Sequence, residues 1–201
     1  MLLKITYAGP AGILRAEQFL KLIFFRHILL RTVHSRMSDS TNYCQVLLLP
    51  RCMAVIARES KNARGVETGG PLVGFLSAAG VLIVTDAAGP GPRAKHERYG
   101  ITIDGKHAQE FCDRINFESE GRIDYVGDWH KHPGISLRPS EQDTLAMKTM
   151  AEFQFSPTRY PVSLIYRSWP RAWQVYFWDG SGGLKRIKSM IAPSDQVKGL
   201  R

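Results

Sequence analysis

The sequence predicts a mixed α/β domain, because β-rich apolar runs alternate with stretches of helical periodicity between residues 46 and 178. Hydrophobic residues make up 44% and charged residues 22% of the 201-residue chain, which excludes a disordered or fibrous protein. The apolar run over residues 19–30 falls short of the roughly 20 residues of a membrane span, and Lys21, Arg26 and His27 interrupt it. We therefore expect one α/β domain and no transmembrane segment.

Two hydrophobic periods locate the helices and strands. Apolar positions three and four residues apart indicate helices, and short β-rich runs bounded by Gly, Pro or Ser indicate strands. Cys112 belongs to such a helical stripe, so we expect it to be a small buried hydrophobe and not a nucleophile. In chain order, the expected elements are strand 46–49, helix 50–65, strands 72–76, 81–85 and 99–103, helix 105–119, strand 123–132, helix 140–153, and strands 161–167 and 172–178.

The strand expected over residues 123–132 carries the most informative pattern. Simple alternation places Ile123, Tyr125 and Trp129 on one face. The opposite face then carries Asp124, Val126, Asp128, His130 and His132. Imidazoles two residues apart on one face can converge on a zinc ion, which needs N, O or S ligands. For Asp128 the pattern leaves two interpretations open: a partner for an imidazole N–H, or a solvated acid.

A third ligand is available at the start of the next helix. Ser140 and Asp143 have the spacing of a helix N-cap and its third residue, so a purely capping role is the simple interpretation. With His130 and His132 just upstream, the same geometry can bring Asp143 to a metal. Two imidazoles and a carboxylate leave one position open, which is the arrangement of a catalytic zinc.

A zinc hydrolase also needs a base for the metal-bound water. Glu67 lies just before an apolar, glycine-containing run that we expect to be buried, an unusual place for a carboxylate. Spacing alone does not select Glu67 over Glu59 or Asp86.

The two ends of the chain differ from the domain. Residues 1–36 supply +5 of the net charge of +9, which argues against a dedicated nucleic-acid site in the remainder. Three interpretations of this basic extension stand: a membrane-surface segment, a partner-binding helix, or sequence upstream of a true start at Met37, which the composition favours. We expect the domain to occupy residues 37–180 and residues 181–201 to form a Gly- and Lys-rich tail. Three cysteines without a CxxC pair indicate a reducing cytoplasm.

The set Glu67, His130-Lys-His132 and Ser140-x-x-Asp143 resembles the JAMM motif of the JAB/MPN metallopeptidases. The resemblance covers about residues 46–178 and implies a cytidine-deaminase-like fold, a curved mixed β-sheet flanked by helices. It further implies one zinc per chain held by His130, His132 and Asp143, with Glu67 as general acid and base and Ser140 stabilising the oxyanion. Members of this family cleave the amide or isopeptide bond after the C-terminal glycine of ubiquitin-like proteins.

A narrower resemblance concerns residues 67–70, 88–94 and 125–133, which are similar to a bacterial branch found on integrative elements and in CBASS anti-phage operons. In that branch an E1/E2-like protein conjugates a nucleotide cyclase to targets, and the JAB peptidase reverses the conjugation. Lys131 departs from the small residue usual between the two histidines, and we expect its side chain to point away from the zinc. Two alternatives remain: trimming of a sulfur-carrier-type precursor, and a catalytically silent MPN scaffold.

Overall fold

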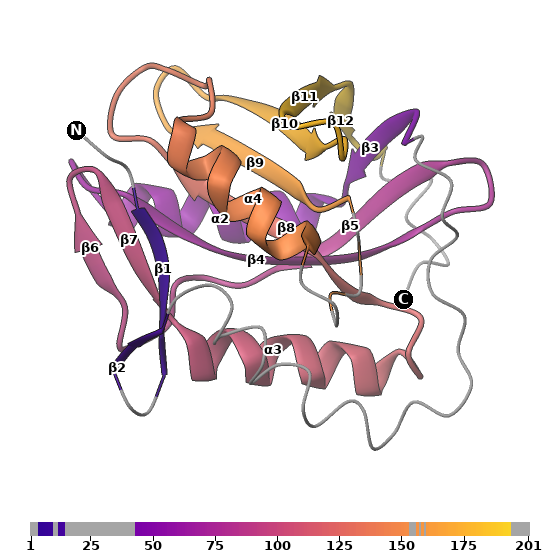
Figure 1. The fold of residues 1–201 in the computed structure, drawn as a ribbon, viewed down its shortest axis with the longest axis horizontal. Helices are drawn as coiled ribbons and strands as arrows, with labels where there is room; N and C mark the ends of the chain where they lie inside the picture. The colour runs from indigo at the N-terminus through magenta and orange to yellow at the C-terminus, as the bar shows by residue number, and fades with distance from the viewer. Residues whose placement is uncertain are drawn as a thin grey trace.

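The computed structural model describes residues 4–9, 12–14, 43–152, 156, 158 and 160–193. The predicted α/β class is confirmed: within these residues, two mixed sheets are packed with three helices (Figure 1). The elements are β1 Lys4–Gly9, β2 Gly12–Leu14, β3 Gln45–Leu48, α2 Pro50–Asn62, β4 Thr68–Leu76, β5 Val81–Ala87, β6 Lys95–Glu97, β7 Gly100–Asp104, α3 Gly105–Glu118, β8 Asp124–Lys131, α4 Glu141–Glu152, β9 Val162–Arg167, β10 Ala172–Trp178, β11 Leu184–Ile187 and β12 Ser189–Ile191.

The main sheet is curved and nearly closed. Its eight strands run in the order β11-β10-β9-β8-β4-β5-β3-β12. The first and last strands of this order, β11 and β12, are separated in sequence by Lys188 alone. The Lys188 carbonyl accepts a hydrogen bond of 2.9 Å from the Val46 amide at the start of β3. One short stretch of chain therefore joins both edges of the sheet.

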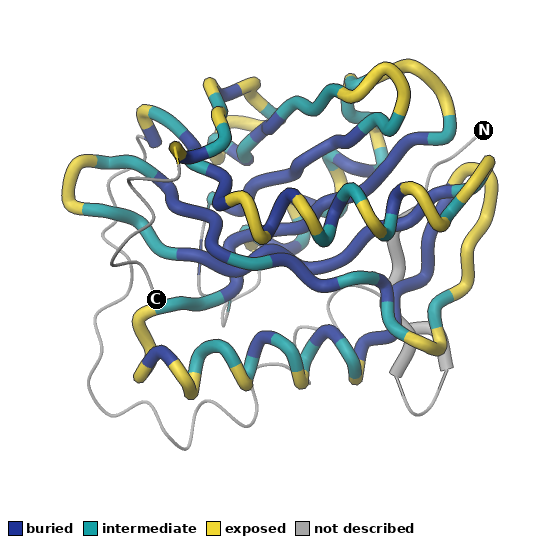
Figure 2. Tube along the Cα trace, turned by 180° about the vertical axis from the view of Figure 1, so that it is seen from behind, coloured by how far each residue is buried: buried dark blue, intermediate teal, exposed yellow. Residues whose placement is uncertain are grey.

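Helices cover both faces of this sheet. Cys52, Met53 and Ile56 of α2 pack into a core cluster with Trp129 and Leu164 from the strands. On the other face, α3 and α4 pack into a second cluster of buried residues: Val73, Ile101, Ile103, Ala108, Cys112, Tyr125, Met147, Met150 and Trp178. The central strands are buried, and the outer sides of α3 and α4 are exposed (Figure 2). Cys112 is buried in the second cluster, as expected for a structural cysteine. Among the residues described, no helix has the length and hydrophobicity that a membrane crossing requires.

The prediction of a C-terminal tail over residues 181–201 was wrong for its first part. Gly180 and Gly182 both have positive φ, at 79° and 111°, and they turn the chain back along β10. β11 then pairs antiparallel with residues 175–178, and Ile187 reaches the α2-side core. β12 pairs parallel with β3. Residues 184–191 are thus part of the main sheet.

Part of the basic N-terminal extension is also paired. β1 runs parallel to β7, and β2 pairs antiparallel with β1, in a second sheet of order β2-β1-β7-β6. The apolar stretch over residues 19–30 lies outside the described residues. The expectation that residues 37–180 form an independent domain stays a prediction.

Strand β8 does not alternate simply, so the predicted division of its residues between two faces was wrong. Its pairing with β4 shifts register between Leu72 and Val73, so Val126 is an extra residue in a bulge. Tyr125 consequently joins the α3 and α4 side, while Val126 and Trp129 both join the α2 side. Beyond the bulge, Gly127 has a φ of 149° and passes so close to β9 that a Cβ atom would lie 1.9 Å from the Val162 carbonyl oxygen.

We predict that Gly127→Ala destabilises the protein by about 3 kcal/mol or more, because it combines a strained backbone with a main-chain clash. Urea unfolding measures the effect. Gly134→Ala is the matched control, since a Cβ at Gly134 meets nothing within 4 Å. It should change stability by less than about 0.5 kcal/mol. Equal stability of the two variants would contradict the role assigned to the bulge.

Candidate metal centre

The candidate centre lies where β8 ends. β4 pairs antiparallel with β8 on one side and places Gly69 opposite His130, and β9 pairs parallel on the other side. A Cβ at Gly69 would lie 2.5 Å from the Trp129 carbonyl oxygen and 3.1 Å from the His130 Cβ. Glycine at this position therefore lets β4 pass close beside the histidine.

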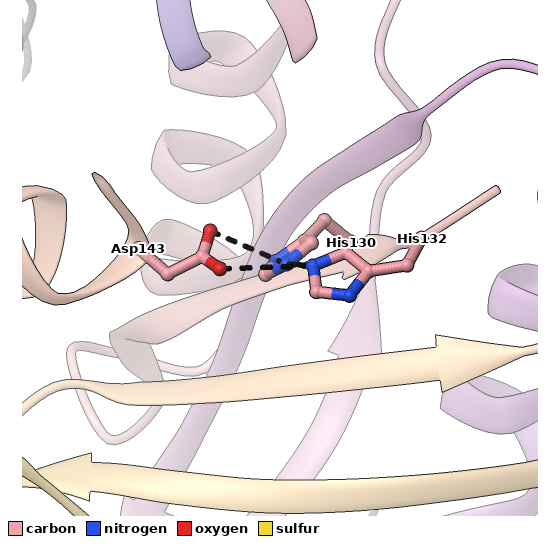
Figure 3. Close-up of side chains that lie close together, drawn as sticks. All are labelled: His130, His132 and Asp143. Carbon is pink, nitrogen blue, oxygen red and sulfur yellow. Dashed lines mark hydrogen bonds and ion pairs between the residues drawn. The ribbon is translucent and has the colours of Figure 1, made fainter. Parts of the chain in front are cut away.

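His130, His132 and Asp143 converge as the sequence spacing predicts. Their ligand atoms all lie within 4.8 Å of one another. The two Nε2 atoms are 2.9 Å apart, and they lie 3.3 and 3.6 Å from Asp143 Oδ1 and Oδ2 respectively. In Figure 3 both imidazoles, from β8 and the residues after it, point toward the carboxylate at the start of α4. The donor set of two nitrogens and a carboxylate suits zinc.

Hydrogen bonding fixes which nitrogen of His132 faces the centre. Its Nδ1 lies 3.1 Å from the Ser136 carbonyl oxygen, which can only accept, so Nδ1 carries the proton. The Nε2 lone pair is thereby directed to Asp143 and His130 and is available to a metal. Among the described residues, His130 Nδ1 and Asp143 Oδ1 are both buried and have no hydrogen-bond partner. A cation at this point would satisfy Asp143 Oδ1, so the residues present fit a metal.

Capping and ligand geometry coexist at Asp143, although the sequence posed them as alternatives. The Asp143 amide donates to Ser140 Oγ at 3.1 Å, and the Ser140 amide donates to Asp143 Oδ2 at 2.7 Å, which is a capping box. Ser140 Oγ also donates to Asp143 Oδ2 at 2.8 Å. Capping orients the carboxylate and leaves Oδ1 directed at His130.

The electrostatic field of the centre favours positive charge. Burial alone would raise the pKa of Asp143, but the two imidazoles and the Ser140 amide outweigh burial and hold that pKa well below its usual range. Burial likewise disfavours charge on His130, yet the adjacent Asp143 carboxylate raises the pKa of this imidazole. The field that favours a proton here also favours a divalent cation between the three groups.

Glu67 lies immediately before β4 and is fully buried. Burial raises the pKa of its carboxyl to about 7; His130 opposes this rise, Asp143 adds to it and Lys131 opposes it. Neither carboxyl oxygen has a hydrogen-bond partner among the described residues. The structure thus places the carboxylate that the family resemblance singled out within the electrostatic reach of two of the three candidate ligands, His130 and Asp143.

Sequence reasoning missed the residues that hold the backbone of Glu67. Its amide donates to the Glu97 carbonyl at 2.9 Å, and the His96 Nδ1 lies 2.8 Å from the Glu67 carbonyl oxygen. Both partners belong to β6, and contacts with the main chain of a distant segment leave no residue pattern that could have revealed them. The solvated-acid interpretation of Asp128 was wrong, because this residue is fully buried. Its charge contributes to the raised pKa of His130, so a role beside the imidazole stays a prediction.

Comparison with known proteins identifies the family. The profile described as prokaryotic homologs of the JAB domain matches residues 50–178. The chain therefore belongs to the prokaryotic JAB-domain family, which confirms the resemblance to the JAB/MPN metallopeptidases. A solution structure of protein DSY2949 from Desulfitobacterium hafniense shares the fold, with a TM-score of 0.56 at 15% identity over 74% of this chain and 94% of that one.

Two curated relatives narrow the class. The chain is 30% identical over 125 residues to "Probable metalloprotease y4qB" of Sinorhizobium fredii, covering 61% of this chain and 76% of the relative. It is 34% identical over 74 residues to "CD-NTase/cGAS isopeptidase" of Escherichia coli, covering 37% of this chain and 47% of the relative. The protein is a JAB-type hydrolase, and its metalloprotease relative implies a metal at a centre of this kind.

We predict that purified wild-type protein holds about one zinc per chain. The zinc content of His130→Ala and of Asp143→Ala should each fall below about 0.1 per chain, because losing one of three protein ligands opens the site to water. Elemental analysis after dialysis measures the content. His107→Ala is the control, since His107 lies on α3 outside the cluster. Wild-type zinc in both ligand variants would contradict the assignment.

We predict a pH-dependent stability gain for Glu67→Gln in the metal-free protein. The pKa of Glu67 rises from 4.5 to about 7 on folding, so the folded state is penalised increasingly as pH rises through this window. The gain at pH 8 should exceed the gain at pH 5 by on the order of 2 kcal/mol. Urea unfolding at both pH values measures it, with Glu110→Gln on the exposed side of α3 as control. A gain that does not depend on pH would rule out the buried charge as its cause.

Proposed function

We propose that the protein is a zinc-dependent isopeptidase that cleaves the amide bond after the C-terminus of a ubiquitin-like protein. The observation that carries this proposal is the convergence of His130, His132 and Asp143 beside the buried carboxylate of Glu67. The relative named as a CD-NTase/cGAS isopeptidase supports an isopeptide bond as the bond that is cleaved. We place the reaction in the cytoplasm of a bacterium, in reversal of conjugation within an anti-phage system.

The proposed catalytic role of each residue follows from the chemistry that the centre can support. A zinc ion held by His130, His132 and Asp143 would activate a water molecule and polarise the scissile carbonyl. Glu67 would act as the general base and acid, taking a proton from the attacking water and passing it to the leaving amine. In the metal-free centre, burial raises the pKa of this carboxyl to about 7, which favours its role as a proton acceptor near neutral pH. Ser140 offers a hydroxyl that can stabilise the oxyanion once it rotates away from Asp143 Oδ2.

We propose that the substrate tail docks on β6, which is an edge strand of the second sheet. β6 is short and its three residues are exposed, and it holds the Glu67 backbone through His96 and Glu97. An extended C-terminal tail that adds to the β6 edge would run toward Glu67, with main-chain hydrogen bonds supplying affinity. We propose this route for the tail of the ubiquitin-like partner. An E1/E2-like enzyme and a nucleotide cyclase are the proposed partners that make its substrate.

We predict that the wild-type enzyme releases a ubiquitin-like protein from a lysine-linked conjugate. Glu67→Gln should retain zinc but lose about 100- to 10,000-fold in kcat, because the amide cannot take the water's proton. A gel assay with the partners' conjugate, a linear tail fusion and casein as parallel substrates measures the specificity. Glu110→Gln serves as the control variant with an intact centre.

Cleavage of each substrate tests a different alternative function. The metal chemistry does not distinguish a lysine amine from a peptide α-amine, so the substrates have to separate these alternatives. Cleavage of the linear fusion alone would favour trimming of a sulfur-carrier-type precursor. Cleavage of casein with the conjugate untouched would make the protein a general metalloprotease. No cleavage of any substrate by a protein that binds no zinc would indicate a metal-free, catalytically silent MPN scaffold.

A further inference from the structure

Lys131 lies between the two histidines, and its side chain is buried with only 7% of the residue exposed. A buried lysine needs a partner, and here the partner is the C-terminal end of α2. Its Nζ donates to the Ser60 carbonyl oxygen at 3.3 Å and also to the Ala63 carbonyl oxygen. The side chain therefore turns to α2, as expected from the sequence, and leaves the ligand positions to His130 and His132.

The end of α2 is a favourable place for a cation. The last carbonyls of a helix lack intrahelical donors and carry partial negative charge. α2 ends at Asn62, with Ala63 as its cap, and Glu67 follows four residues later. Lys131 thus binds the helix end from which the chain leads directly to Glu67.

The same lysine holds the other end of this connection. In the pairing of β4 with β8, Lys131 lies opposite Thr68, the residue after Glu67. The segment over residues 60–68 is consequently fixed to β8 twice, by the Lys131 side chain at its start and by strand pairing at its end. Glu67 lies inside that segment.

Nothing among the described residues holds the Glu67 carboxylate itself by a hydrogen bond. Its position depends on the backbone that carries it. We infer that Lys131 is a positioning residue, which fixes the α2–β4 connection and thereby sets where the Glu67 carboxylate meets the metal centre. This inference rests on the proposed hydrolytic function, in which Glu67 handles the proton.

The chain offers variants that separate this role from general folding. Lys131→Met keeps the length and removes the donors, while Lys131→Arg keeps a cation. Ser168 Oγ lies 3.4 Å from the Ser60 carbonyl oxygen, so that acceptor keeps a donor in either variant and the fold should persist. Lys61→Met is the control, because Lys61 is an exposed cation in the same last turn of α2.

Two measurements test the inference. Against the conjugate, Lys131→Met should lose about 10- to 100-fold in kcat with KM within about twofold and zinc at the wild-type level, because misplacing a catalytic group by about 1 Å costs that much. Lys131→Arg should recover at least about fivefold of this loss, and Lys61→Met should match the wild type. By hydrogen exchange, the Glu67 amide, which donates to Glu97, should exchange about tenfold faster in Lys131→Met.

A wild-type kcat in Lys131→Met would overturn the inference. Loss of zinc in parallel with kcat would also overturn it, because Lys131 would then act on the histidines. A third result would also contradict the inference: Lys131→Arg is as slow as Lys131→Met, and in both variants the Glu67 amide exchanges at the wild-type rate. If the wild type cleaves no conjugate, the proposed function fails, and the exchange of the Glu67 amide still decides whether Lys131 holds the segment.

Discussion

Burial of ionisable groups without enough internal partners is the constraint on which this site depends. Glu67 and His130 are fully buried, and Asp143 and His132 are 2% and 8% exposed. Burying charged or polar groups without partners costs several kcal/mol. Within the described residues, Ser140 satisfies one oxygen of Asp143, while the other oxygen and both oxygens of Glu67 accept no hydrogen bond. The fold therefore supports a centre that a cation and its water would stabilise, and reactivity is maintained at the expense of stability.

The surrounding elements explain why the polypeptide can maintain such a centre. β8 lies between β4 and β9 in the middle of the main sheet, so His130 is carried by one of the best-supported strands. A capping box directs Asp143 from the start of α4. Backbone contacts with β6 and the Lys131 contact with α2 hold the segment that contains Glu67. Groups from three separate parts of the chain, β8, α4 and the α2–β4 connection, thus meet at the centre.

The features that the sequence predicted depend on local geometry, and the features that it missed depend on contacts between distant segments. The candidate ligand set follows from local geometry, because His130 and His132 share a strand face and Asp143 occupies a fixed position in a helix cap. Glu67 lies far upstream, and family resemblance was needed to select it. The bulge at Val126 and the strands of residues 184–191 depend on pairing between distant segments, which hydrophobic periodicity does not report. The buried Lys131 contact with α2 is non-local for the same reason.

X-ray absorption at the zinc edge of the zinc-loaded protein tests the central claim most directly. The account predicts four nitrogen or oxygen ligands at about 2.0–2.2 Å, with the imidazole scattering of two histidines. His132→Ala should remove one imidazole contribution from any zinc that remains. Sulfur ligands at about 2.3 Å, or a spectrum that His132→Ala leaves unchanged, would contradict a centre built from His130, His132 and Asp143.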